Sequence, residues 1–81
     1  MIDDVADRAR RVLADVLGVA ISEIDDNSSP DTIESWDSLK QMNLIVALED
    51  EFGISFSDND VVEMLNFRLI TSILSASPIR R

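Results

Sequence analysis

Apolar residues recur at helical spacing in four stretches of the chain, and polar, turn-forming segments separate these stretches. In the first stretch the apolar positions form one stripe of a helix: Val5, Ala9, Val12, Leu13, Val16 and Leu17. Asp3 and Asp4 suit the N-terminus of this helix, because carboxylates complement the positive end of the helix dipole. Gly18 is a suitable C-terminal stop.

The segment 18–37 lacks this periodicity and predicts a long connection. Its run 25–31 is polar and turn-rich. Oxygen-bearing side chains alternate along the run, as in a calcium-binding loop. Pro30 stands where that loop needs Gly, however, and Trp36 stands where it needs a bidentate Glu, so a calcium site is not predicted. Three isoleucines are expected to anchor the connection on the core: Ile21, Ile24 and Ile33.

The strongest helical pattern follows Asp37, the predicted N-cap, and ends at Phe52 before Gly53. Ser38 then lies in the first turn. A helical wheel divides the apolar residues of this helix between two faces. The larger set is assigned to the core: Leu44, Ile45, Leu48 and Phe52. The second set forms what we call the apolar stripe, Leu39, Met42 and Val46, with Asn43, Glu49 and Asp50 beside it.

The apolar stripe has two interpretations. So short a chain is poorly able to bury a helix all round, so the stripe is expected to be exposed and to dock partner proteins, with Glu49 and Asp50 at its rim. Alternatively, other helices of the bundle cover it.

Two further helices are predicted after a short extended link that Ile54 and Phe56 pin to the core. Ser57 and Asp60 resemble a capping box that opens a short helix with four apolar positions: Val61, Val62, Met64 and Leu65. Asn66 is the expected N-cap of a last helix, which carries Phe67, Ile70, Ile73 and Leu74. The predicted fold is therefore all-α, a small four-helix bundle with a long loop between helices 1 and 2 and a short helix 3. We expect residues 1–81 to form a single domain with a frayed tail at 76–81, including Pro78.

The amino-acid composition limits the kinds of partner and of catalysis that the chain can support. The 81 residues have a net charge of −9, from 16 acidic and 7 basic side chains, and an acidic surface repels nucleic acid and anionic lipid. No apolar run is long enough to span a membrane, so we expect a soluble, cytoplasmic monomer. Arg8, Arg10 and Arg11 are interpreted as a solvated face with local ion pairs, or alternatively as a docking patch. The chain has no His and no Cys, which excludes a nucleophile–His pair and Cys or His metal sites.

Ser38 is the candidate site for covalent chemistry. A serine in the first turn of a helix often does no more than satisfy the backbone. Without a His to act as base, Ser38 is not a self-activated nucleophile, so a separate enzyme must modify it if it is functional. A phosphate ester suits this place, because the helix N-terminus offers unpaired N–H groups and a positive dipole end. Asp37 is expected to orient Ser38 for that enzyme.

Asp37, Ser38 and Leu39, followed by an amphipathic helix that ends in 47–52, resemble the attachment motif and second helix of acyl carrier proteins. The order of the other predicted helices is similar along nearly the whole chain. The resemblance implies that Ser38 carries 4′-phosphopantetheine, installed by a phosphopantetheinyl transferase from coenzyme A with a metal ion. It also implies that acyl-loading and acyl-transferring enzymes bind to the apolar stripe. Members of this family are not themselves enzymes, and the core set of the second helix matches their core or acyl-cavity positions.

The sequence departs from the commonest carriers of fatty-acid synthesis at Lys40 and Asn43, where acidic residues are usual, and at the bulky Trp36. The Gly-Gly run of peptide-synthetase carriers is also missing. These departures favour a dedicated carrier of a specialised pathway over a housekeeping role in fatty-acid synthesis. We expect a free-standing acyl carrier that serves a fatty-acid, polyketide or other specialised pathway of lipid metabolism. Two alternatives remain: an aminoacyl or peptidyl carrier, and an acidic helical interaction module in which Ser38 only opens a helix.

Overall fold

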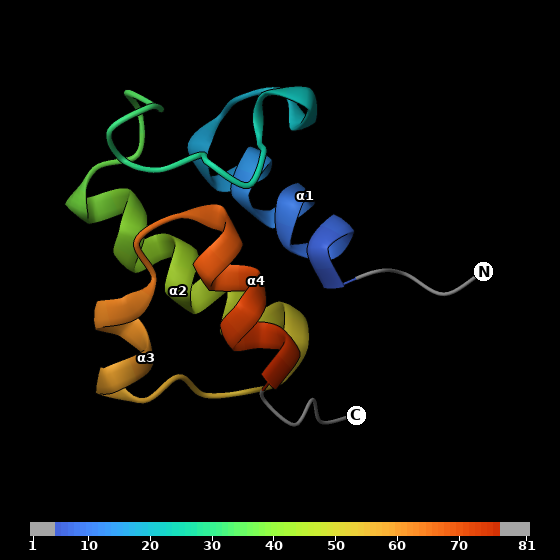
Figure 1. Cartoon of the computed structure of the whole chain (residues 1–81), viewed down its shortest axis with the longest axis vertical. Helices are drawn as coiled ribbons and strands as arrows, with labels where there is room; N and C mark the ends of the chain where they lie inside the picture. Colours follow the sequence, from blue (N-terminus) through green and yellow to red (C-terminus); the bar gives the residue numbers. More distant parts are fainter. Residues whose placement is uncertain (1–4, 77–81) are drawn as a thin grey trace.

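A computed structural model describes residues 5–76, and this part of the chain contains four α-helices and no strand (Figure 1). The helices are α1 (Val5–Leu17), α2 (Ser38–Phe52), α3 (Asp58–Glu63) and α4 (Phe67–Ala76). A short 3-10 helix, η1 (Ile21–Glu23), lies in the long loop. The predicted all-α bundle, with its long first loop and short third helix, is confirmed. The expected roles of Asp3 and Asp4, and of the tail beyond Ala76, fall outside the described residues.

Both long N-terminal helices end at a glycine in the left-handed conformation. Gly18 has a φ of 70° and Gly53 a φ of 65°, values that residues other than glycine rarely adopt. In each case the glycine N–H closes the last turn, onto Ala14 O at 2.9 Å and onto Glu49 O at 2.8 Å. The predicted stops of both helices are confirmed.

The two C-terminal helices begin at the caps that the sequence predicts. Ser57 Oγ accepts the Asp60 N–H, and Asp60 Oδ2 accepts the Ser57 N–H, both at 3.1 Å. At α4, Asn66 Oδ1 accepts the Leu69 N–H at 2.8 Å. Each cap satisfies backbone donors that have no partner inside the helix, which fixes where the helix starts.

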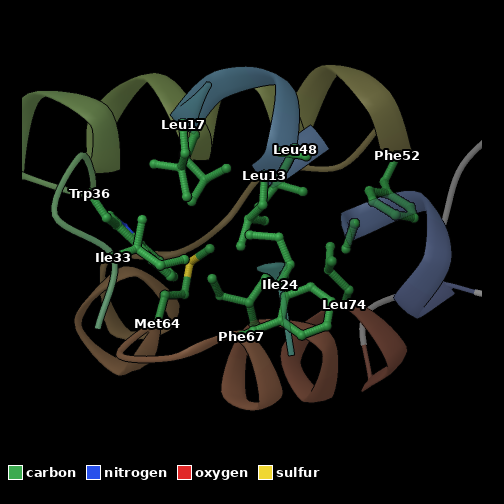
Figure 2. Close-up of a cluster of buried hydrophobic side chains, with 14 residues drawn as sticks. Leu13, Leu17, Ile24, Ile33, Trp36, Leu48, Phe52, Met64, Phe67 and Leu74 are labelled. Carbon is green, nitrogen blue, oxygen red and sulfur yellow. The ribbon is translucent and has the colours of Figure 1, made fainter. Parts of the chain in front are cut away.

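One core lies between α1, α2 and α4, which point apolar side chains toward one another (Figure 2). Ile33, Trp36 and Met64 lie together at one end of this core, and Phe52 lies at the other (Figure 2). The predicted core face of α2 is confirmed in its main members, since three of them are fully buried: Leu44, Leu48 and Phe52. Ile45 is half-buried and packs against them.

Two details of the predicted packing are wrong. Ile21 is not an anchor, because its side chain is 49% exposed. The loop turns at η1, where the Ile24 N–H bonds to Ile21 O at 3.0 Å, and only Ile24 at the end of this turn reaches the core. The predicted short helix also ends earlier than expected. Met64 leaves the helical conformation, with a ψ of 65°, so that its side chain enters the core while Leu65 is 63% exposed.

The arginines of α1 do more than form local ion pairs. Arg10 pairs with Asp7 on the same helix at 2.8 Å, as expected of a local pair. Arg8 instead reaches across to α2, where it pairs with Glu51 at 3.0 Å and lies over the ring of Phe52, 4.6 Å from its centroid. The Arg8 guanidinium also donates to Glu51 O at 2.9 Å, so this side chain ties α1 to the end of α2.

Candidate functional site

Asp37 and Ser38 form the entry to α2. Asp37 has an extended backbone, with a φ of −110°, and its Oδ1 accepts the Lys40 N–H at 2.9 Å. It is therefore the N-cap, as predicted, and Ser38 is the first helical residue. Ser38 is exposed, and its hydroxyl makes no hydrogen bond to the described residues. The helix thus begins without using the Ser38 hydroxyl.

The nearby Ser35 offers an instructive contrast. Its hydroxyl donates to Leu17 O at 2.9 Å, and the residue is half-buried. That bond ties the loop to the end of α1, so modification of Ser35 would cost the loop an anchor. Of the two serines on either side of Trp36 and Asp37, only Ser38 presents a hydroxyl that the fold does not already use.

The buried side chain of Trp36 packs beneath the start of α2 and is bonded to it. Its side chain is only 2% exposed, and its Nε1–H donates to Gln41 Oε1 at 2.6 Å. Gln41 Nε2 in turn donates to Met64 O at 3.3 Å. One amide side chain of α2 therefore connects the loop before Ser38 to the segment after α3. We call this pair of hydrogen bonds the Gln41 bridge.

The Gln41 bridge was not foreseen from the sequence. Trp36 is separated from Met64 by 28 positions, and no local pattern joins them. The sequence does contain a signal for exposed apolar side chains in this region, namely two adjacent apolar pairs, Val61-Val62 and Met64-Leu65. Two side chains in a row on a short helix do not both face one core, so one member of each pair had to face outward.

A groove of about 680 Å³ opens beside Ser38, between the first turns of α2 and the α3 region. Ser38 and Met42 contribute from α2, and Trp36 and Gln41 line it as well. The opposite side is apolar and comes from α3 and the segment after it: Val61, Val62, Met64 and Leu65. Val62 and Leu65 are 67% and 63% exposed. The groove therefore joins the candidate serine to an apolar surface that the bundle leaves open.

The apolar stripe on α2 is exposed, as predicted, and the other helices do not cover it. Leu39 and Met42 are each 66% exposed, and Val46 is 65% exposed. Asp50 is exposed beside the stripe. Glu49 is half-buried, and its Oε2 accepts the Phe56 N–H at 2.8 Å. Glu49 therefore holds the link after α2 in place, and Asp50 is the less constrained of the two acids.

These features together make up the candidate site. Within residues 5–76, no cluster of three or more acidic side chains is arranged to hold a metal ion. None of the helices seen in this range is long and apolar enough to cross a lipid bilayer. The site consists of one uncommitted hydroxyl at a helix N-terminus, a groove beside it and an exposed apolar face, which is the arrangement of a carrier domain.

Residues 7–72 match the family described as "Phosphopantetheine attachment site", and the chain belongs to this family. Its cofactor is 4′-phosphopantetheine, which is bound covalently to a serine. Carrier domains of this kind are not catalytic themselves, and they interact with a modifying transferase and with partner enzymes. The match begins within α1 and ends within α4, and it includes the entry to α2.

The described residues fit this group. The phosphodiester needs an accessible hydroxyl, and Ser38 is exposed. It also needs neutralising donors, and the first N–H groups of an α-helix have no partner inside the helix. Asp37 caps only the Lys40 N–H, so the Ser38 and Leu39 N–H groups stay available to an anion at this end.

Proposed function

We propose that the protein is an acyl carrier protein and that Ser38 bears its phosphopantetheine arm. The observation that carries this proposal is the exposed Ser38 hydroxyl at the start of α2, which makes no contact that the fold requires. Ser38 lies inside the span that matches the family, and the helix is capped by Asp37 and not by Ser38.

Attachment requires the Ser38 oxygen to attack the phosphate of coenzyme A that bears the pantetheine arm. A P–O bond to Ser38 forms, the P–O bond between the two linked phosphates of coenzyme A breaks, and the nucleoside bisphosphate leaves. The chain has no His to accept the hydroxyl proton, so the transferase must supply the base. Within the chain, Asp37 fixes the direction of the first turn, and the helix N-terminus stabilises the negative charge on the new phosphodiester.

When bound, the arm supplies a thiol that holds acyl groups as thioesters, which a chain without Cys otherwise lacks. The chain's own residues then present this group and do not act on it. We therefore propose a carrier without catalytic activity of its own, which serves partner enzymes of a fatty-acid, polyketide or other specialised pathway.

We further propose that partner enzymes bind α2 through the apolar stripe, Leu39, Met42 and Val46. All three side chains are about two-thirds exposed and lie on the helix that begins at Ser38. A partner that covers them gains from the removal of apolar surface from water. Asp50 at the rim favours partners with a basic surface, with a smaller contribution from Glu49, whose carboxylate already bonds the backbone.

The test is intact mass spectrometry after incubation with coenzyme A, magnesium and a broad-specificity phosphopantetheinyl transferase. Wild type should gain the mass of one phosphopantetheine, and Ser38→Ala should gain none. Ser72→Ala, which removes another exposed helical serine, should gain the same mass as wild type. Loss of the Ser38 hydroxyl should cost no more than about 1 kcal/mol of unfolding free energy, so the variant stays folded. A loaded Ser38→Ala protein contradicts the proposal.

A further inference from the structure

A second groove lies between α1 and α2, and we call it the α1 groove. It has a volume of about 540 Å³, and its lining comes from α1, η1 and α2. Its apolar part consists of Val12 and Val16, which also pack against the core, together with Ala47 and Ile21. The α1 groove is separate from the groove beside Ser38, because the two have no lining residue in common.

Ile21 lines the α1 groove with a side chain that the loop does not use. It is 49% exposed, and only Ile24 at the end of η1 is buried in the core. The turn itself uses the Ile21 carbonyl, which accepts the Ile24 N–H at 3.0 Å. A single exposed apolar side chain is common on a protein surface. Ile21 adjoins the other apolar side chains of the groove, however, so a contiguous apolar surface is left open here.

The rim of the α1 groove carries more negative than positive charge. Three acidic and two basic side chains line it: Asp15, Asp50 and Glu51, and Arg8 and Arg11. Arg8 and Glu51 pair with each other across the groove at 3.0 Å. The other three are exposed, and none of them makes an ion pair with a described residue. Two unpaired carboxylates and one unpaired guanidinium favour an occupant with a basic side chain.

The α1 groove is continuous with the apolar stripe. Ala47 and Asp50 line the groove, and both also line the hollow beside Val46. Val46 belongs to the stripe and is 65% exposed. A protein that covers the stripe therefore reaches the edge of the α1 groove without any rearrangement of the bundle.

Resting on the docking function proposed for the apolar stripe, we propose that the partner enzyme extends its contact from the stripe into the α1 groove. The occupant is a segment of that enzyme in which an apolar side chain stands beside an arginine or a lysine. The apolar side chain packs against Ile21 and Val16, and the basic one lies at the acidic rim, near Asp15. This contact makes α1 and η1 part of the recognition surface, so the partner selects this carrier by residues outside α2.

The experiment first obtains the partner through the stripe. Val46 is replaced by the photo-crosslinking residue benzoylphenylalanine in the arm-bearing protein, and irradiation in an extract of the producing organism captures the enzyme bound there. The captured enzyme is identified by mass spectrometry and purified. Its dissociation constant for arm-bearing wild type and for groove variants is then measured by calorimetric titration.

A matched pair of variants tests the apolar part of the α1 groove. Ile21→Ser should weaken binding about five-fold, because an apolar contact is lost. Leu69→Ser changes an apolar side chain on α4 that is 36% exposed and lies outside the groove, and it should bind as wild type does. Thermal unfolding verifies that both variants are folded. Equal dissociation constants for the two variants would overturn the groove as a docking site.

The charges of the rim give predictions of opposite sign. Asp15→Asn should weaken binding about three-fold, and Arg11→Ala should strengthen it about two-fold, because Arg11 repels a basic occupant. Both effects should shrink at high salt. Asp26→Asn removes an exposed acid outside the groove and should leave binding unchanged. Weaker binding of Arg11→Ala, or equal effects of Asp15→Asn and Asp26→Asn, would overturn the basic occupant.

The outcomes separate this inference from the proposed function. Failure to capture any enzyme from Val46 overturns docking on the stripe and this inference with it, whereas attachment at Ser38 is tested independently by mass. Capture from Val46 with wild-type binding of Ile21→Ser overturns the groove alone. A dimer in sedimentation velocity that Ile21→Ser abolishes also overturns it, since the occupant is then a second copy of the chain.

Discussion

Asp37 and Ser38 are neighbours in the sequence and have separate roles at the start of α2. The Asp37 carboxylate accepts the Lys40 N–H at 2.9 Å and caps the helix. The Ser38 hydroxyl is exposed and contributes nothing to the cap. This division matters because a serine that capped the helix would lose its hydrogen bond on modification. At this site Asp37 supplies the cap, so a bulky phosphodiester can be added to Ser38 without loss of that hydrogen bond.

Substitution of Asp37 separates its capping role from its charge. Asp37→Asn keeps a good N-cap, so the unfolding free energy should change by less than about 0.5 kcal/mol. Asp37→Ala removes the cap and should cost about 1 kcal/mol. If the carboxylate orients Ser38 for the transferase, both variants should lower kcat/KM for modification. The measurements are thermal unfolding and the initial rate of phosphopantetheine transfer. An unchanged rate for Asp37→Asn would contradict the orienting role and leave Asp37 as a cap alone.

The roles of Asp37 as the cap and of Ser38 as the first helical residue are predictable from the sequence, because caps and helix starts are encoded within a few residues. The partners of Trp36 are not, since the Gln41 bridge depends on where the chain returns after α3. The sequence pattern marks Trp36 only by its bulk and as a residue that does not fit a calcium loop. Its burial follows from tertiary packing, which single-residue patterns do not encode.

At the scale of the element, α2 has one apolar face inside the bundle and another outside it. Leu48 is fully buried, whereas Val46, two positions earlier, is 65% exposed. A helix with apolar residues on opposite sides gains stability only from the inner ones. The outer ones make sense if another protein covers them during part of the carrier's cycle.

An added charge on the outer face tests this account. Val46→Asp should leave the unfolding free energy within about 0.5 kcal/mol of wild type, because the site is exposed. It should lower kcat/KM of a partner enzyme about ten-fold, equivalent to about 1.4 kcal/mol, because a charge would be buried in an apolar contact. Met42→Asp should behave in the same way.

Ser72→Asp on α4 is the matched control, since it adds the same charge at an exposed position away from the apolar stripe. Its partner kinetics should resemble those of wild type. Equal losses in Val46→Asp and Ser72→Asp would show that net charge, and not docking on α2, controls the reaction.

The contact between α1 and α2 through Arg8 yields a prediction about stability. Arg8→Ala removes an ion pair, a bond to Glu51 O and the packing over Phe52. The unfolding free energy should fall by about 1–2 kcal/mol. Arg11→Ala, at an exposed position of the same helix, should change it by less than about 0.5 kcal/mol. Urea denaturation measures both, and equal effects would contradict the tie between the helices.

The elements themselves differ in how far the sequence predicts them. The ends of α1 and α2 follow from Gly18 and Gly53, and the start of α3 follows from the Ser57 box, because each signal is local. The end of α3 does not follow, since Met64 leaves the helix to enter a core built by distant residues. The exposure of Ile21 is of the same kind. Its apolar side chain suggested an anchor, but η1 places only Ile24 against the core.

On the scale of the whole molecule, composition and fold agree. A chain with a net charge of −9 and neither His nor Cys supplies no thiol and no imidazole. In its family the thiol comes with the cofactor, and carrier domains of this kind are not catalytic themselves. What the bundle contributes is a buried core between three helices, an exposed serine at the start of one of them, and an acidic surface that favours basic partners.

We propose that Ser38, and no other serine, carries the arm. The most direct measurement is a peptide map of protein isolated from cells that also make a phosphopantetheinyl transferase. Cleavage after glutamate releases the peptide 35–49, bounded by Glu34 and Glu49, in which Ser35 and Ser38 are the only serines. We predict that fragmentation of this peptide places the whole mass of phosphopantetheine on Ser38. Modification of Ser35 or of a serine in any other peptide, or a protein that stays unmodified, would contradict the account.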